Sequence, residues 1–330
     1  MIETDCVCVL GPERPGAIVR RRALPDTSPG AVLVKVDYAG LNYKDALATV
    51  PHANVVRSFP RIGGSDFSGV VVESRDPSFA SGDLVFSCAN GLGVDRDGGF
   101  AGFVILSGDH LRHLPQSLST FEISALGVAG ITAALSVHLL EAQGLVPGQG
   151  PVLVTGATGG VGTMAIEMLA RLGHEVVALT GKCDQEQLLL DLGASEVLVA
   201  TALQASTKPL GRATWAGAID NVGGETFDRV IRRMKPKACL ASVGNAAGNV
   251  FTSNLLPFIL RGVRIVGVNL TEYAALMDVL LARLAEEIKP TRALSRTQVI
   301  AMDDVPRMLE AMIARKTTGR IVMRPQLSTL

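Results

Sequence analysis

Residues 151–165 run Pro151-Val-Leu-Val-Thr-Gly-Ala-Thr-Gly-Gly-Val-Gly-Thr-Met-Ala165. The first part, Val152 to Thr155, consists of β-favouring residues and predicts a buried strand. After the glycines, apolar residues recur at helical spacing from Val161 to Leu172, and Gly173 ends the predicted helix. A strand, a glycine turn and a helix form the context of a dinucleotide-binding loop, because bare backbone can approach a pyrophosphate at the positive end of the helix.

The loop departs from the strict G-x-G-x-x-G pattern, because Ala157 takes the first glycine position. A second strand predicted at residues 175–180 supports a cofactor site. The alternative is a turn of the same shape that is kept for packing and binds nothing. The cofactor-binding candidates in this turn are Gly156, Thr158, Gly159, Gly160, Val161 and Gly162.

Strands and helices alternate after residue 124, which predicts an α/β fold with a doubly wound parallel sheet. Residues 1 to about 120 instead predict β-strands separated by turn residues, as in a partly closed antiparallel barrel. We expect residues 1–123 to form the catalytic barrel-like domain and residues 124–267 the Rossmann domain. Residues 268–330 are expected to return to the catalytic domain.

The composition limits the possible partners and compartments. Lysine plus arginine equals aspartate plus glutamate, at 31 each, so no basic excess favours nucleic acid or an anionic membrane. The five scattered cysteines favour free thiols in a reducing compartment, and the N-terminus lacks the pattern of a signal peptide, so we expect a cytoplasmic protein. The uncharged run from Ile123 to Leu140 is expected to be a buried helix that bridges two domains, with a membrane span as the alternative.

Several further motifs resemble one branch of a known family. They are Asn42-Tyr-Lys-Asp45, Phe59-Pro-x-Ile-x-Gly-x-Asp66-Phe-x-Gly, Ala129-Gly-Ile-Thr-Ala, Trp215-Ala-Gly-Ala-Ile-Asp, Pro257-Phe-Ile-Leu-Arg and Gly319-Arg320. With the glycine turn, they resemble the zinc-free acryloyl-CoA reductase branch of the medium-chain dehydrogenase/reductase superfamily, whose members are often named quinone oxidoreductases. The resemblance covers nearly the whole chain.

This resemblance implies a GroES-like catalytic domain split around a Rossmann domain, NADPH as the cofactor, no metal, and reduction of a carbon–carbon double bond conjugated to a carbonyl. It also implies a homodimer that pairs the last sheet strand, here residues 264–268, across a two-fold axis. Two stretches depart from the branch, and the second weakens the case for a CoA thioester if the arginines that it lacks help to hold a CoA phosphate. The stretches Val50-Pro-His-Ala-Asn54 and Asn269-Leu-Thr-Glu-Tyr273 replace a glycine-rich stretch and an arginine pair of the branch.

The expected catalytic residues follow from the same resemblance. Segment 42–45 holds no cysteine where zinc-dependent relatives carry a ligand, so hydrogen-bond donors must polarise the carbonyl. Asn42 and Tyr43 are the candidate donors, and Tyr43 could also protonate the α-carbon. The alternative is that Tyr43 is only a core tyrosine. Asp45, Asp66 and Arg320 form a second catalytic group, or else a buried ion pair that ties the tail to the barrel.

The choice of cofactor rests on the end of the second Rossmann strand. An NAD enzyme needs an acid there to accept a hydrogen bond from the ribose, but the chain has Thr180-Gly181-Lys182, and Lys182 can pair with a 2′-phosphate. Asp184 is interpreted as a helix N-cap. Further cofactor contacts are expected at strand ends and in the linking helix; they are Thr132, Asn221, Gly244 and Asn245, with Tyr43 and Arg320 from the other domain. For Asn221 and Asn245 a simple turn role is the alternative.

These observations favour an NADPH-dependent reductase of an acryloyl-type thioester or enone. Reduction of a quinone is the alternative within the enzyme class, because charge develops at a similar place. The alternative from another class is a cofactor-binding structural or RNA-interacting protein without turnover. The balanced charge argues against RNA, and the Asn42–Asp45 segment argues against loss of chemistry.

Overall fold

The central stretch forms the strand, turn and helix that its residues predict. In the computed structural model, β9 covers Val152–Thr155 and α3 covers Gly160–Arg171. The structure describes residues 3–24, 28–51, 53–203 and 208–326. It contains two compact units: one comprises Met1–Val128 and Arg296–Leu330, and the other comprises Ala129–Ser295. Each unit is described separately below.

The second unit holds a six-stranded sheet in the order β11-β10-β9-β12-β13-β14, with every neighbouring pair parallel. Numbered along this unit, the order is 3-2-1-4-5-6, the order of dinucleotide-binding folds, in which ligands bind where the winding reverses. The reversal lies between β9 and β12. The other elements are β10 (Val176–Thr180), α4 (Glu186–Asp191), β11 (Glu196–Val199), β12 (Trp215–Asp220), α5 (Gly224–Ile231), β13 (Met234–Ser242), α6 (Leu256–Arg261), β14 (Arg264–Gly267), α7 (Met277–Glu286) and α8 (Thr291–Ser295).

The predicted α/β fold class is therefore confirmed, with two local differences. Helix α5 ends at Ile231 and β13 already begins at Met234, so the strand starts earlier than its apolar run at 238 indicates. Asp184 is not an N-cap: it lies inside a short 3-10 helix, Cys183–Gln185, and accepts a hydrogen bond from Gln185. The N-cap of α4 is Gln185, because the 3-10 turn extends the helical path by one turn before α4 begins.

The first unit contains two β-sheets and matches the expected β-rich, GroES-like architecture. Strands β2, β1 and β4 form a small sheet in that order, and a larger sheet has the order β15-β16-β3-β5-β6-β8, with β7 paired to β3. The elements are β1 (Glu3–Val9), β2 (Ala17–Ala23), β3 (Ala31–Gly40), α1 (Tyr43–Leu47), β4 (Arg61–Ile62), β5 (Asp66–Ser74), β6 (Leu84–Cys88), β7 (Phe103–Ser107), β8 (Arg112–His113), β15 (Gln298–Ala301), α9 (Val305–Ile313) and β16 (Ile321–Arg324).

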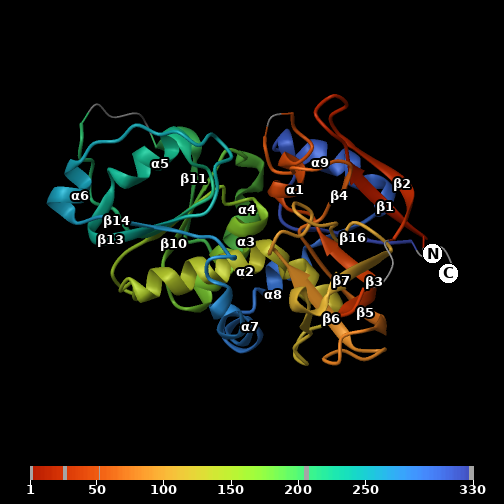
Figure 1. Ribbon diagram of the computed structural model, residues 1–330. Coiled ribbons are helices and arrows are strands. Elements are labelled where there is room, and N and C mark those ends of the chain that lie inside the picture. The colour runs from red at the N-terminus through yellow and green to blue at the C-terminus, as the bar shows by residue number, and fades with distance from the viewer. Residues whose placement is uncertain (1–2, 25–27, 52, 204–207, 327–330) are drawn as a thin grey trace. The chain divides into compact units, whose positions relative to one another are not determined.

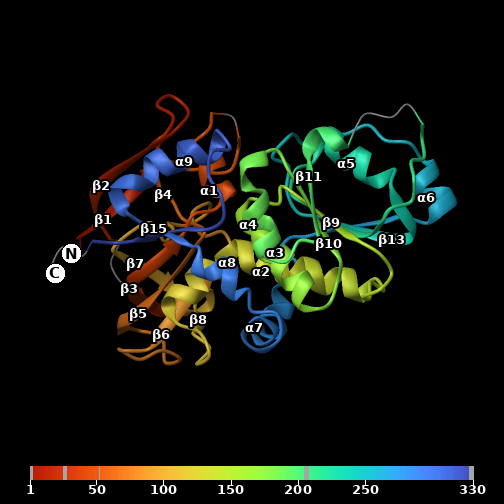
Figure 2. The ribbon, with the colours of Figure 1, turned by 180° about the vertical axis from the view of Figure 1, so that it is seen from behind.

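The C-terminal segment completes this first unit. Strand β16 pairs antiparallel with the end of β3 and parallel with β15. Helix α9, blue in Figures 1 and 2, lies over the red strands β1 and β2. Its apolar face enters the same core as β1: Val305, Met308 and Leu309 belong to one buried cluster with Val7. The last part of the chain thereby packs against the first.

Helix α2 (Thr120–Ala142) contains the uncharged run. It is long and apolar enough for a membrane span, but 89% of its most apolar window is buried inside the protein, as expected for a core helix. The first domain boundary falls inside this helix, between Val128 and Ala129.

The second boundary follows Ser295, later than the expected position at residue 267. Helices α7 and α8 belong to the nucleotide-type unit because they are anchored there. Arg283 of α7 forms an ion pair with Glu141 at 2.6 Å. The buried carboxylate of Glu167 on α3 accepts hydrogen bonds from the backbone N–H groups of Arg292 and Ala293 in α8.

Candidate active site

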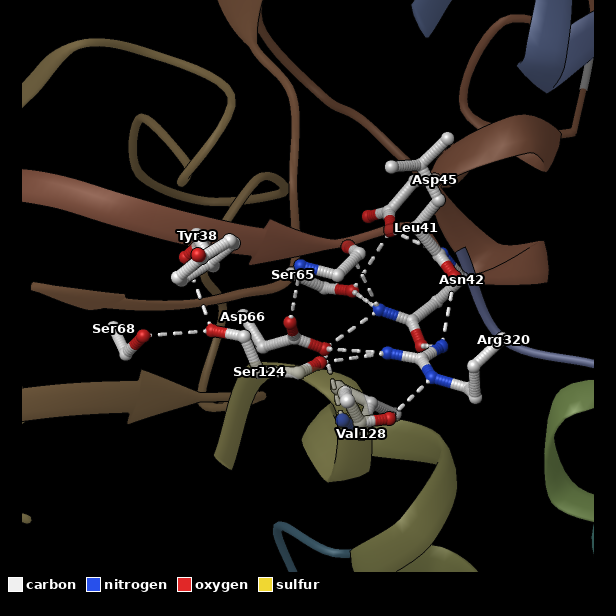
Figure 3. Close-up of polar contacts among 12 residues, drawn as sticks. Tyr38, Leu41, Asn42, Asp45, Ser65, Asp66, Ser68, Ser124, Val128 and Arg320 are labelled. Carbon is white, nitrogen blue, oxygen red and sulfur yellow. Dashed lines mark hydrogen bonds and ion pairs between the residues drawn. The ribbon is translucent and has the colours of Figure 1, made fainter. Parts of the chain in front are cut away.

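Arg320 and Asp66 lie at the centre of a buried polar network in the first unit. Arg320 comes from the residue before β16 and Asp66 begins β5. Their side chains are each 2% exposed, and Nη2 of Arg320 lies 4.0 Å from Oδ2 of Asp66. Figure 3 shows how the guanidinium and the carboxylate point toward each other. The structure thus brings together two charged residues that are 254 positions apart in the sequence (320 − 66).

The remaining donors of Arg320 are occupied by the protein itself. Its Nε donates to the carbonyl of Ala125 at 2.7 Å and its Nη2 to that of Ser124 at 3.1 Å. Nη1 donates to the carbonyl of Leu41 at 2.8 Å and to Oδ1 of Asn42 at 2.9 Å. A guanidinium bound on every side in this way ties the C-terminal strand to α2 and to the start of α1. The geometry favours a structural and positioning role for Arg320.

Asn42 connects the charged pair to the first turn of α1. Its Nδ2 donates to Oδ2 of Asp66 at 2.8 Å and to Oγ of Ser65 at 3.1 Å, while its Oδ1 accepts from Arg320. The residue is 6% exposed. Because both amide hydrogens are committed to buried acceptors, Asn42 in this conformation orients its neighbours and has no free donor for a substrate oxygen.

Asp45 fixes the beginning of helix α1. Its Oδ2 accepts the backbone N–H of Asn42 at 2.9 Å and the hydroxyl of Ser65 at 3.2 Å, which forms a capping box with Asn42 as the N-cap. Burial, together with the negative charge of Asp66, raises the pKa of the Asp45 carboxyl to about 7. Burial also raises the pKa of Asp66, while Arg320 and three donated N–H bonds oppose that rise. Because all three bonds are donated to Asp66, they favour its carboxylate form.

A kink in α2 makes room for this network. Gly127 has φ 47° and ψ −152° within the helix, and a Cβ there would lie 2.5 Å from Oδ2 of Asp66 and 2.7 Å from Nη2 of Arg320. The kink turns the N–H of Val128 toward Asp66 Oδ2 at 2.8 Å. Ser65, Ser124, Gly127 and Val128 were not identified from the sequence. A glycine inside a long apolar helical run was the available signal.

Tyr43 is the first residue of α1 and differs from its neighbours in exposure. It is partly exposed and Lys44 after it is exposed, whereas Asn42 and Asp45 are buried. Among the described residues its hydroxyl has no hydrogen-bond partner, so the donor remains available to a ligand. The capping box holds the backbone on which this ring is carried.

The second unit carries the glycine turn at the N-terminus of α3. Gly159 is the N-cap and no side chain caps the helix, which leaves its first N–H groups available to an anion. A Cβ on Gly162 would lie 2.5 Å from the carbonyl oxygen of Gly156, so only glycine allows this helix to start so close to the turn. Thr158 is buried beside Thr180, with their hydroxyl oxygens 3.4 Å apart. These features fit a dinucleotide pyrophosphate.

The end of β10 forms the expected second part of a dinucleotide site. The hydroxyl of Thr180 accepts the N–H of Lys182 at 3.0 Å, which shapes the turn after the strand. Gly181 is exposed, with nothing within 4 Å of the position of an added Cβ. Burial lowers the pKa of Lys182, and the nearby charge of Asp184 opposes this. A lysine at this strand end suits a phosphate better than a bare ribose hydroxyl.

The ends of β12 and β13 hold the other predicted contacts. Asn221 donates from Nδ2 to the carbonyl of Thr155 at 2.8 Å, and its Oδ1 is buried without a hydrogen-bond partner among the described residues. Such an orphaned acceptor at the point where the sheet winding reverses fits a ligand hydroxyl or amide. Asn245 is exposed and bonds Asn249, and the carbonyl of Asn245 accepts the N–H of Gly248, as in a turn. Gly244 is the residue before Asn245. The remaining predicted contact, Thr132, is a buried residue of α2.

The structure offers no ready metal site in the part of the chain that it describes: no group of three or more His, Cys, Asp or Glu side chains is placed to hold an ion there. The independence of metal expected from the sequence stays a prediction.

Two domain families match this chain. The alcohol dehydrogenase GroES-like domain matches residues 28–116, and the zinc-binding dehydrogenase family matches residues 160–286. YhfP of Bacillus subtilis (strain 168), a quinone oxidoreductase by name, is 40% identical over 311 residues, which is 93% of this chain and 94% of that protein. The acrylyl-CoA reductase AcuI of Ruegeria pomeroyi is 36% identical over 310 residues, with the same shares covered.

Solved structures show the same fold over the whole chain. The yhdH oxidoreductase of Salmonella enterica in complex with NADP superposes with a TM-score of 0.89 at 34% identity and covers 98% of this chain and 100% of that one. Bacillus subtilis yhfP with NAD bound superposes with a TM-score of 0.91 at 36% identity and the same coverage.

Proposed function

Because the chain belongs to the acryloyl-CoA reductase branch of the medium-chain dehydrogenase/reductase superfamily, we propose that it is an NADPH-dependent reductase of activated carbon–carbon double bonds. The substrate class is an alkene conjugated to the carbonyl of a thioester or an enone. The observation that carries this proposal is Tyr43, a partly exposed hydrogen-bond donor held at the start of a helix by a buried network.

Two parts of the second unit, the start of α3 and the end of β10, form the proposed cofactor site. The N–H groups at the start of α3, around Gly159 to Gly162, would hold the pyrophosphate. Lys182, with Thr180 and Gly181, would hold the 2′-phosphate, and Asn221 offers an unpaired acceptor. NADP in the Salmonella structure supports this choice, whereas NAD in the Bacillus structure makes the preference worth measuring.

The roles proposed for the protein's residues follow from the negative charge that develops on the substrate during the reaction. Bound NADPH supplies a hydride to the β-carbon of the alkene. Negative charge then develops on the substrate carbonyl oxygen, and the hydroxyl of Tyr43 can donate a hydrogen bond to it. Tyr43 can also deliver the proton that the α-carbon needs, directly or through a water molecule. Asn42, Asp45, Asp66 and Arg320 act as positioning residues, because their polar groups already bond one another.

A substrate screen tests the proposal. NADPH oxidation is measured with acryloyl-CoA, simple enones and quinones, before and after exhaustive chelation. Turnover of an alkene, unchanged by chelation, supports an alkene reductase without metal. Turnover of quinones alone would make this a quinone reductase, as the name of the Bacillus relative suggests. NADPH binding without turnover of any of them would contradict an enzyme of this class.

We also propose that the chain forms a homodimer through β14. This strand is the last in the sheet order, so one of its edges lacks a neighbour among the described strands. Six large apolar residues between positions 250 and 265 are exposed by 39% to 84%: Val250, Phe251, Leu255, Ile259, Leu260 and Ile265. Their grouping on and just before β14 supports pairing of this edge with a second copy.

A cytoplasmic location is likewise a proposal. All five cysteines are free, which agrees with a reducing compartment. A small-molecule substrate requires no nucleic acid or membrane partner.

A further inference from the structure

Two cysteines outside the proposed active site lie side by side on β1. Cys6 and Cys8 are two residues apart on a strand, so their side chains project from the same face. Their sulfur atoms are 3.7 Å apart, and neither residue has exposed surface. Neither is used by the mechanism proposed above.

The neighbouring strand places a cation on one of the two sulfurs. Arg20 of β2 lies directly opposite Cys6 in the register, and its Nε donates to Sγ of Cys8 at 3.1 Å. The hydrogen bond from Cys6, together with Arg20, lowers the pKa of the Cys8 thiol to about 6. Arg22, which is paired with Asp97, contributes in the same direction. The hydrogen bond from Arg20 and the lowered pKa both favour Cys8 as the member of the pair that ionises.

Cys6 has the opposite environment. Its Sγ lies 3.4 Å from the carbonyl oxygen of Arg20, which can accept its S–H hydrogen, and Cys8 is the other acceptor. The hydrogen bond with Cys8 and burial both raise the pKa of Cys6. Two sulfurs in contact, with the guanidinium of Arg20 hydrogen-bonded to that of Cys8, are arranged as an attacking and a resolving cysteine.

We propose that Cys6 and Cys8 form a redox-active pair that reacts with hydroperoxides and closes to an intramolecular disulfide. The Cys8 thiolate attacks the terminal oxygen of the hydroperoxide, the O–O bond breaks, and the released alkoxide takes a proton to become the alcohol. The Cys6 sulfur then attacks the Cys8 sulfenic acid and water leaves. Two thiols and one hydroperoxide give one disulfide, one alcohol and one water.

Access and closure both depend on the small sheet. Strand β2 is the outer strand in the order β2-β1-β4, so opening it exposes the pair while β1 stays bonded to β4. Positions two apart on a strand are separated by about 6.8 Å, near the upper limit for Cα atoms joined by a disulfide, so closure shortens β1 locally.

Peptide mapping of the full chain tests the proposal. Trypsin does not cut between Arg14 and Pro15, so residues 1–20 form one peptide with both cysteines. The reduced protein is treated with hydrogen peroxide, denatured, alkylated and digested. This peptide should appear unalkylated and two hydrogen atoms lighter, and a reductant should restore alkylation. If both thiols remain alkylatable under conditions that oxidise the exposed Cys183, the proposal is wrong.

Single variants test the assigned roles. Cys6→Ser should leave a Cys8 sulfenic acid that dimedone traps, whereas Cys8→Ser should leave Cys6 unoxidised. Arg20→Gln should slow oxidation by about tenfold, because it removes the charge that stabilises the thiolate. Arg21→Gln is the matched control, since Arg21 lies on the opposite face of the same strand and is 59% exposed in its side chain. Equal rates for the two arginine variants would overturn the role of Arg20.

The unmutated protein provides a test that needs no variant. The alkylation rate of Cys8 should rise with pH around a midpoint well below that of an ordinary thiol, with Cys183 as the internal comparison. A midpoint for Cys8 equal to or above that of Cys183 would contradict the thiolate assignment. None of these readouts depends on NADPH turnover, so they remain informative whatever substrate the enzyme uses.

Discussion

The amide nitrogen of Asn42 lies 2.8 Å from Oδ2 of Asp66, and this hydrogen bond joins the start of α1 to the start of β5. Through the same amide, Asn42 also holds Arg320 at 2.9 Å. One side chain therefore forms hydrogen bonds with two buried charged groups. It also fixes the position of the residue that follows it, Tyr43. We therefore expect changes at Asn42 to affect mainly stability and changes at Tyr43 to affect mainly turnover.

Replacing Asn42 should act mainly on stability. Asn42→Ala leaves Asp66 and Arg320 each short of a buried partner, which costs on the order of 2–4 kcal/mol of unfolding free energy. Denaturant unfolding measures this, with Asn249→Ala, an exposed asparagine, as the control. An unfolding free energy equal to that of the control would show that the network does not depend on Asn42.

Replacing Tyr43 should act mainly on turnover. Tyr43→Phe keeps the ring but removes the donor, and a single preorganised donor is worth about 3 kcal/mol, so kcat should fall roughly ten- to a thousandfold. NADPH affinity should stay unchanged. Tyr38→Phe is the matched control, because the Tyr38 ring packs on Phe121. The double variant with Asn42→Ala must also lose turnover; near-normal rates in it would remove this segment from the mechanism.

Asp45 should make stability depend on pH. Its pKa rises from 3.8 to about 7 on folding, so the folded state holds a proton that the unfolded state has lost between these values. The free energy of unfolding should therefore fall as pH rises from about 4 to 7, by on the order of 1–3 kcal/mol from this group. Asp45→Asn should flatten that slope in thermal melts. A slope of the same size in the variant would assign it to other groups.

Lys182 should select the phosphorylated cofactor. Lys182→Ala removes a charged donor to the 2′-phosphate, so NADPH affinity should weaken about ten- to a hundredfold while NADH affinity hardly changes. Isothermal titration with each cofactor measures both constants. Lys235→Ala is the charge-matched control, because Lys235 donates to the carbonyl of Gln149. Equal constants for NADPH and NADH in the unmutated protein would refute the assignment.

The β14 edge should control assembly. Ile259→Glu places a charge on a residue that is 69% exposed beside the proposed two-fold contact, and should convert a dimer to a monomer in sedimentation velocity. Val279→Glu, at a residue of α7 that is 47% exposed, should leave the dimer intact. A monomeric unmutated protein, or a dimer that survives the Ile259 change, would contradict the proposed interface.

The sequence alone determined the nucleotide-type unit in considerable detail. Strand β9 has the bounds predicted for it, and α3 begins one residue before the predicted start. These elements follow from local rules: β-favouring residues form a strand, glycines permit the turn, and helical spacing of apolar residues forms the helix. The alternation of such elements also determined the class of sheet, because parallel strands need a crossover connection, which is usually a helix.

Only the tertiary structure decided which polar residues of the first unit form hydrogen bonds with one another. Arg320 and Asn42 are 278 positions apart. No local sequence pattern predicts which acceptors the side-chain amide of Asn42 bonds. The same holds for the kink at Gly127, the domain boundary after Ser295 and the contact of Arg20 with Cys8. Secondary structure is encoded by neighbours along the chain. Hydrogen-bond partners and pKa values depend on burial and on distant segments, which only the folded chain brings together.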